Sequence, residues 1–197
     1  MEKKKSNWPL IVGLGVVWIA LVGGGLTILV KRLTKDVLVT EADKAAVVGA
    51  FDLIPYFDGY SPDKEHETLG KSEWFDQSVE IEYEYDSPLE EDPYINVTIS
   101  KEASNGDASA AYMTQWSSLK MGFEIASQAF KFQEDNTFYQ AGDRSRFANI
   151  ELEGEFVGHL LVARKGNTIY SFLMTGFVID DPSVWKELFD GRIAALE

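Results

Sequence analysis

The sequence predicts an α+β fold class: an N-terminal single transmembrane helix, followed by one domain with a mainly antiparallel sheet of about 5-6 strands packed with helices. Three observations support this prediction. They are an uncharged run near the amino terminus, several segments in which apolar and polar residues alternate, and segments with apolar residues at helical spacing. The elements follow in the order helix, two strands, helix, three or four strands, helix. Strands that succeed one another in this way pair as antiparallel hairpins.

The uncharged run covers residues 8–30, WPLIVGLGVVWIALVGGGLTILV. As a helix it extends about 34 Å, enough to cross a hydrocarbon core about 30 Å thick. Because KRLTKD follows directly, and the run is longer than that of a secretory signal, we expect a retained signal anchor; the alternative is a signal peptide that is cleaved inefficiently. The chain then divides into a short basic tail (1–7), the anchor (8–30), a juxtamembrane linker (31–39) and an acidic α+β domain (40–197).

The formal charge divides unevenly between these parts. Residues 1–35 carry a net charge of +5 and residues 36–197 one of −19. A domain this acidic is repelled by phosphate groups, which argues against nucleic-acid binding. Its expected counterparts are basic proteins, inorganic cations or simply water, and the possible partner is a basic protein or a membrane complex. Basic residues flank the anchor in equal number, but Lys3, Lys4 and Lys5 next to the free amino terminus favour a tail that stays inside. The expected location is a membrane, with the domain outside the cytoplasm, most simply a bacterial inner membrane with a periplasmic or external domain.

Within the acidic domain, local patterns predict each element in turn. Thr40 starts a helix that Pro55 ends, and residues 58–77 are polar and rich in turn formers. Alternation predicts strands, and helical spacing predicts a long helix with Asp107 as its N-cap. A final helix starts at Asp181, with proline in its first position. The expected strands are 78–87, 94–100, 145–153, 155–164 and 167–178, with 127–133 as a short sixth one, and the long helix is 106–126.

The segment SVEIEYEYDS, residues 78–87, places four carboxylates on one side of a predicted strand: Glu80, Glu82, Glu84 and Asp86. Neighbouring side chains on one face of a strand lie about 6.6–6.8 Å apart, so a straight strand cannot bring three carboxylates onto one ion. We expect a solvated strand face; a cation patch at Glu80, Glu82 and Glu84, or a surface for a basic protein partner, are the alternatives. Arg144 and Arg146 alternate on another strand and are the expected internal partners of this row.

No sequence motif marks a catalytic, cofactor-binding or metal site. The chain has no cysteine, which excludes disulfides, thiolate zinc sites and cysteine nucleophiles. His66 lies in a polar, acidic segment and His159 between apolar residues of a strand; neither has a serine or carboxylate at a recognisable spacing. We therefore expect no cofactor, a solvated His66 and a structural His159.

These features favour a non-enzymatic accessory or protein-interaction module, carried by a single-pass membrane protein. Two alternatives remain open. One is a small-ligand-binding domain in which aromatic side chains such as Tyr83, Tyr85 and Trp116 line a pocket. The other is a hydrolase whose carboxylates assemble in space.

Overall fold

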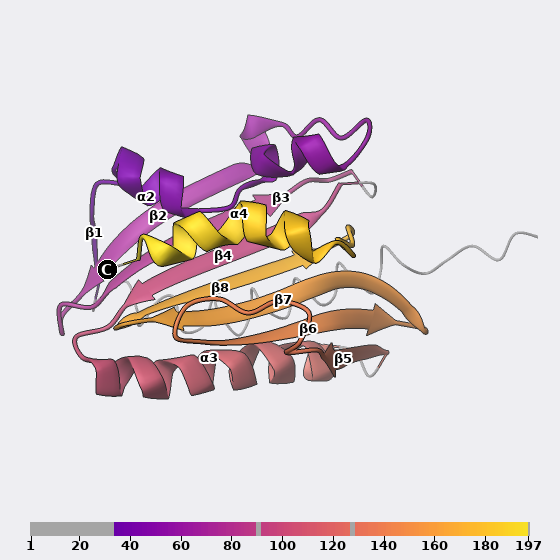
Figure 1. Cartoon of the computed structure of the whole chain (residues 1–197). Coiled ribbons are helices and arrows are strands. Elements are labelled where there is room, and N and C mark those ends of the chain that lie inside the picture. The colour runs from indigo at the N-terminus through magenta and orange to yellow at the C-terminus, as the bar shows by residue number, and fades with distance from the viewer. Residues whose placement is uncertain (1–33, 90–91, 127–128, 197) are drawn as a thin grey trace, which may run out of the picture.

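The computed structural model describes residues 34–89, 92–126 and 129–196, and these ranges form one antiparallel sheet of eight strands, three α-helices and two short 3-10 helices (Figure 1). The strand order across the sheet is β1-β2-β3-β4-β8-β7-β6-β5. The strands are β1 (Thr34–Asp36), β2 (Glu67–Trp74), β3 (Val79–Asp86), β4 (Tyr94–Lys101), β5 (Phe130–Glu134), β6 (Arg144–Leu152), β7 (Glu155–Lys165) and β8 (Thr168–Thr175). The helices are α2 (Glu41–Ala46), η1 (Ala50–Tyr56), η2 (Lys64–His66), α3 (Asn105–Ala126) and α4 (Pro182–Ala194).

This architecture corrects the predicted fold class. Helices and antiparallel strands are combined as expected, but the prediction of five or six strands is wrong, because the sequence pattern indicates no strand at β1 or β2. The predicted transmembrane helix is not supported either. No helix in the described ranges is long and apolar enough to cross a membrane, and the predicted span at 8–30 lies outside those ranges. The structure therefore supports the α+β part of the prediction and not its membrane-spanning part.

Several of the other predicted elements are confirmed. β3 and β4 form the expected antiparallel hairpin, and β6, β7 and β8 form the expected meander. Asp181 caps α4, with Pro182 in the first position. The cap of α3 differs from the prediction, because the Ser104 hydroxyl accepts a hydrogen bond from the Asp107 amide at 3.2 Å. Asp107 is therefore the third residue of that helix and not its N-cap.

The N-terminal helical segments are held on the sheet by two tyrosine hydroxyls. The single helix predicted to end at Pro55 is in fact two, α2 and η1, separated by an extended stretch. In that stretch the Val48 amide donates to the Tyr170 hydroxyl at 3.2 Å, and at the start of η1 the Ala50 amide donates to the Tyr83 hydroxyl at 2.8 Å. These buried acceptors satisfy amides that a continuous helix would have paired internally, so the break carries no orphaned donor at either position.

The larger core lies on the sheet face that η1 and α4 cover. Alternate residues of β3, β4, β6, β7 and β8 point into it, and Trp185 and Phe189 of α4 pack at its centre with their rings stacked 5.0 Å apart. Figure 1 shows α4 lying across the middle strands, with α2 and η1 beside it. An ion pair of 2.8 Å between Arg192 of α4 and Asp52 of η1 joins these helical elements. Helices of the described ranges therefore cover the centre of this face and its β2 and β3 side.

On the opposite face of the sheet, the helix of the described ranges that packs there, α3, covers only the half formed by β5 to β8. α3 packs Ala108, Tyr112 and Trp116 against side chains of β5, β6, β7 and β8, which form the second core. Figure 1 shows α3 running along the β5 and β6 side of the sheet. Within the described ranges, no helix makes its main contacts with β2, β3 or β4 on this face. We call this half, which no helix of the described ranges covers, the open half, although Ser100 on it is buried and Glu80 and Glu84 are only partly exposed.

Candidate functional site

The open half of the sheet has a polar floor that carries four carboxylates, and we call it the acidic half-face. The antiparallel register sets the side chains of three strands in rows, with Ser72 of β2 opposite Glu80 and Glu80 opposite Ser100 of β4. Because side chains alternate along each strand, every second residue points to the same side. The members of the acidic half-face are Thr68, Gly70, Ser72, Glu80, Glu82, Glu84, Asp86, Asn96, Thr98 and Ser100.

Alternation in β3 builds this face and the core at the same time. The residues between the carboxylates, Ile81, Tyr83 and Tyr85, are buried in the larger core, with Tyr85 fully buried. Burial of these side chains fixes the register of the strand, since a slip of one residue would turn the carboxylates into the core. The positions of the carboxylates are therefore set by a rigid part of the sheet and not by a loop.

The electrostatics of the acidic half-face are those of crowded like charges. Burial in the sheet, and then the neighbouring carboxylate of Glu82, raise the pKa of Glu80. The pKa of Glu82 is also raised, first by loss of hydration of its carboxylate and then by the neighbouring carboxylate of Glu84, although Glu82 is an exposed residue. The hydroxyl of Tyr94 donates to Glu84 at 2.9 Å. Within the described residues, no Lys or Arg lies within 4 Å of the four carboxylates.

One flank of α3 borders the acidic half-face. The amide of Gln115 donates to the Ser171 hydroxyl of β8 at 2.9 Å, which fixes how the helix is rotated. Three residues share its side of the helix, because they lie four positions before Gln115 (Ala111) or three and seven positions after it (Ser118 and Gly122). All four side chains are small or polar. The open half is therefore a strip of sheet that carries carboxylates and is bordered on one side by small and polar side chains of α3.

The arrangement does not gather its carboxylates around one point. In the described part of the chain, no three acidic or histidine side chains are close enough to hold one metal ion. Glu80, Glu82 and Glu84, the residues of the predicted cation patch, remain spread along a single strand. Their opposite neighbours on β4 are Ser100, Thr98 and Asn96, as the hairpin predicts.

The expected pairing of this row with Arg144 and Arg146 is wrong. Both arginines lie on β6, and three strands separate β6 from β3 in the sheet order. The Arg144 guanidinium lies over the Tyr112 ring, 5.3 Å from its centre, and that of Arg146 lies 5.5 Å from the centre of the Trp116 ring. Their cation–π contacts hold α3 on the sheet and leave the acidic half-face without these cations.

The two histidines lie in different elements, His159 in β7 and His66 in η2. His159 is 1% exposed; its Nδ1 donates to the Asn149 side-chain oxygen at 2.9 Å, and its Nε2 accepts from the Ile179 amide at 2.8 Å. Because Nε2 accepts a hydrogen bond, the ring must be neutral, and burial lowers the pKa of His159 to about 4. His66 ends η2 and is partly exposed, with its ring 6.4 Å from that of Tyr85. These contacts agree with the structural role expected for His159.

The aromatic residues that the ligand-binding alternative invokes do not share a pocket. Tyr83 and Tyr85 are buried in the larger core, whereas Trp116 belongs to the second core beneath α3, on the other face of the sheet. The Tyr83 hydroxyl donates to Glu67 at 2.7 Å while accepting from Ala50, and that of Tyr85 donates to Asp92 at 3.2 Å. These hydroxyls act as structural hydrogen-bonding groups.

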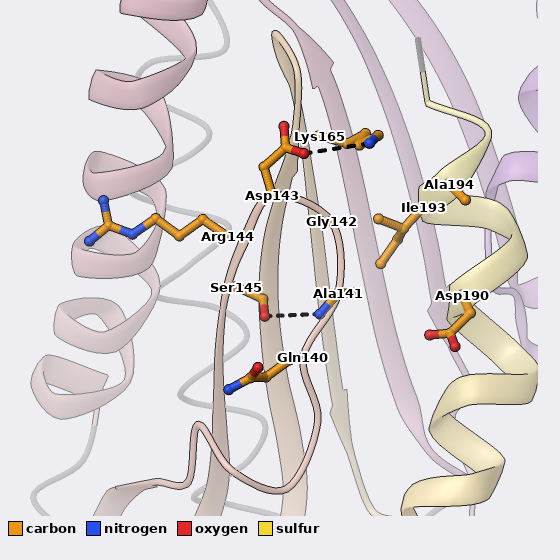
Figure 2. Close-up of a pocket in the computed structure, with 10 residues that line it drawn as sticks. All are labelled: Gln140, Ala141, Gly142, Asp143, Arg144, Ser145, Lys165, Asp190, Ile193 and Ala194. Carbon is orange, nitrogen blue, oxygen red and sulfur yellow. Dashed lines mark hydrogen bonds and ion pairs between the residues drawn. The ribbon is translucent and has the colours of Figure 1, made fainter.

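A hollow of about 680 Å³ lies between the loop that precedes β6, the end of β7 and the last turns of α4 (Figure 2). One of its two carboxylates is already engaged, since Asp143 accepts from the Gly166 amide at 2.7 Å and lies 3.5 Å from Lys165. Figure 2 shows Arg144 pointing away from this hollow, toward α3. Asp190, on the α4 side, accepts from the Tyr139 hydroxyl at 2.8 Å. The polar groups of the hollow thus stabilise the fold.

Sequence patterns identified the carboxylates of the site, but they did not indicate that α3 covers other strands of the sheet and not these. The α3 flank at Ala111, Ser118 and Gly122 had no sequence signal, because helical spacing alone does not say which strands a helix covers. That choice depends on the pairing of β4 with β8, which are about 70 residues apart along the chain. No family model, curated protein or solved structure matches this chain, and its function is therefore argued from this site.

Proposed function

We propose that the domain is a non-enzymatic interaction module that binds a basic segment of another protein on the acidic half-face. The observation that carries the proposal is the contrast between the two halves of one sheet face. α3 closes the half formed by β5 to β8, whereas no helix of the described ranges covers β2 to β4, whose carboxylates are exposed at Glu82 and Asp86 and partly buried at Glu80 and Glu84. A surface with four like charges and no neighbouring cation among the described residues is complementary to a cationic partner.

The raised pKa values of Glu80 and Glu82 support the same proposal. Each carboxylate is less stable in its charged form than it would be in water, partly because of its acidic neighbour. A Lys or Arg side chain placed between two of them removes that repulsion and gains a charge-assisted hydrogen bond. Contacts of this kind govern the association rate and the choice of partner, and they weaken as salt screens them.

Neither alternative function is favoured by a specific contact. A hydrolase of the predicted kind needs two carboxylates that face one reacting bond. The acidic side chains of the half-face follow one strand instead, and the aromatic residues named for a ligand pocket lie in two separate cores. We assign to a partner the acidic half-face, whose four carboxylates have no ion pair with a described Lys or Arg.

A binding titration with a matched charge control tests the proposal. The probe is a fluorescent short oligolysine added to the full-length chain, kept in a non-ionic detergent because of its uncharged segment, with anisotropy read at about 50 mM and about 200 mM salt. One variant carries Glu80→Gln, Glu82→Gln and Glu84→Gln. The control carries Asp58→Asn, Glu65→Gln and Glu155→Gln, three exposed acidic residues away from the half-face, and so has the same net charge.

We expect the first triple variant to bind about 10-fold more weakly than the unchanged chain, as three pairs worth about 0.5 kcal/mol each would give. In the control variant, the loss of binding free energy should be less than half as large as in the first variant. Equal losses in both variants would mean that the probe responds only to overall charge, and absence of binding at low salt would equally overturn the proposal.

A further inference from the structure

We infer that three arginines beside α3 bind a small molecule that carries a phosphate group, with the Tyr112 hydroxyl as a further donor. The three are Arg144 and Arg146 of β6 and Arg164 of β7, and we call them the arginine cluster. They lie on the half of the sheet that α3 covers and not on the acidic half-face, so this site is independent of the proposed function.

Strand pairing places two of these positive charges side by side. Arg144 is directly opposite Arg164 in the register of β6 and β7, and Arg146 is opposite Val162, which is buried beneath α3. Opposite residues of an antiparallel pair point to the same face of the sheet, as do alternate residues of one strand. Like charges directly opposite one another destabilise a sheet. An anion bound between these arginines would remove that repulsion.

Within the described ranges, no carboxylate neutralises the arginine cluster. None of the three guanidinium groups has an Asp or Glu oxygen within 4 Å in those ranges. Glu134 of β5 contributes a charge near Tyr112, but it lies 3.7 Å from Lys120 of α3. The positive charge of the cluster is therefore uncompensated in the described part of the chain, although residues 36–197 carry a net charge of −19.

The contacts of the cluster with aromatic rings leave its hydrogen-bond donors available. The Arg144 guanidinium lies 5.3 Å from the centre of the Tyr112 ring, and that of Arg146 lies 5.5 Å from the centre of the Trp116 ring. Such a contact uses the face of the guanidinium, whereas its five N–H donors lie in its plane. Arg144 is exposed and Arg146 is partly exposed, so these donors can reach a ligand from solvent. Figure 2 shows the Arg144 side chain extending toward α3.

Two buried donors at the cluster have no partner among the described residues. Tyr112 is 1% exposed, and its hydroxyl makes no hydrogen bond there. The same holds for the buried Nε of Arg164, whose Nη1 donates to the Ser109 hydroxyl. Burial raises the pKa of Tyr112, and the charges of all three arginines oppose this effect, so its hydroxyl lies within their field. Unpaired buried polar groups are rare in proteins, and a bound ion is one of their causes.

The donors of the cluster favour phosphate over other anions. A phosphate group has three terminal oxygens and about 1.5 to 2 negative charges, whereas a carboxylate has two oxygens and a single charge. Planar guanidinium groups bind phosphate oxygens through paired hydrogen bonds. A nucleic-acid backbone would be repelled by the remainder of a domain with a net charge of −19. The ligand is therefore a small phosphate-bearing molecule.

A titration with inorganic pyrophosphate tests this site. The full-length chain is kept in a non-ionic detergent without divalent cations, and binding is measured by isothermal titration calorimetry. The variants are Arg144→Gln, Arg164→Gln and Tyr112→Phe, of which the last keeps the ring beneath Arg144 and removes only the hydroxyl. The control is Lys186→Gln, which removes one positive charge at an exposed position of α4. Circular dichroism checks that each variant is folded.

Arg144→Gln and Arg164→Gln should each weaken pyrophosphate binding about 10-fold, and Tyr112→Phe about 5-fold, because each removes a hydrogen bond to a charged group. Lys186→Gln should change it by less than about 2-fold. An equal loss in this control, or no saturable binding below about 10 mM pyrophosphate, would overturn the site. Citrate carries a comparable charge on carboxylates, and equally tight binding of citrate would refute the choice of phosphate. Oligolysine binding should be unchanged in Tyr112→Phe, so the two proposals fail separately.

Discussion

Lowering the pH should weaken the fold through His159. Its ring is neutral in the fold, held by Asn149 and the Ile179 amide among uncharged aromatic rings. Burial lowers its pKa from 6.5 to about 4. The unfolded chain binds this proton near pH 6.5, whereas the folded chain binds it only near pH 4. The stability that the neutral ring contributes is therefore fully present above pH 6.5 and is lost as the pH falls toward 4. At about 1.4 kcal/mol per pKa unit the total loss is about 3 kcal/mol, with about 2 kcal/mol lost by about pH 5.

Urea unfolding of the full-length chain at about pH 7 and about pH 5, followed by tryptophan fluorescence, measures this loss. The comparison is His159→Gln, which does not titrate. It should be less stable at pH 7 by about 1–3 kcal/mol, because a buried partner loses its hydrogen bond. Glu80 and Glu82 act in the opposite direction, since their raised pKa values favour the fold as they protonate, but they are common to both proteins. An equal pH dependence in both, or a His159 resonance that titrates near 6.5, would refute the reasoning.

Three further substitutions test the fold. Tyr170→Phe removes the buried acceptor of the Val48 amide and should cost about 1–3 kcal/mol in urea unfolding; a loss below 0.5 kcal/mol, roughly, would mean that water replaces it. Gly158→Ala places a Cβ 2.0 Å from the Met174 carbonyl oxygen and should cost about 3 kcal/mol or more, and an unchanged melting temperature would contradict this close approach. Glu153→Asn, at φ 54°, should raise the melting temperature by about 1–2 °C, and any decrease would contradict the turn geometry.

Local patterns predicted the elements whose buried and exposed residues alternate cleanly. In β3 the apolar residues Ile81, Tyr83 and Tyr85 separate carboxylates, and in α4 the cap at Asp181 precedes a buried face. In each case one face is buried and the other solvated, so side-chain periodicity reports the backbone directly. The positions of the acidic residues on one side of a strand followed from the same periodicity.

The missed strands lack that signal. β2 reads ETLGKSEW, and on its core side Lys71 takes a position that an apolar residue would normally occupy. Its ammonium forms an ion pair of 2.9 Å with Asp43 of α2, so tertiary contact replaces hydrophobic burial. β1 has only three residues, and it exists because Thr34 pairs with Trp74 at the sheet edge. Neither contact can be inferred from neighbouring residues.

For a related reason, the place of the candidate site within the sheet could not be predicted from the sequence. Arg144 and Arg146 alternate on one side of β6 as predicted, yet strand order places them beneath α3 and away from Glu82. Strand order follows from the pairing of β4 with β8, a contact between distant segments that depends on the packing of both cores. The open half of the sheet is a consequence of that pairing.

The most direct test of the central claim is to locate bound oligolysine by NMR. Backbone amide shifts of the isotopically labelled full-length chain are followed as the probe is added at low salt. We predict that the shifts concentrate on β3 and β4, at Glu82 and Thr98, and on the Gln115 and Gly122 flank of α3. Shifts centred on Asp143 in the hollow of Figure 2, or spread evenly over all acidic surfaces, would contradict it.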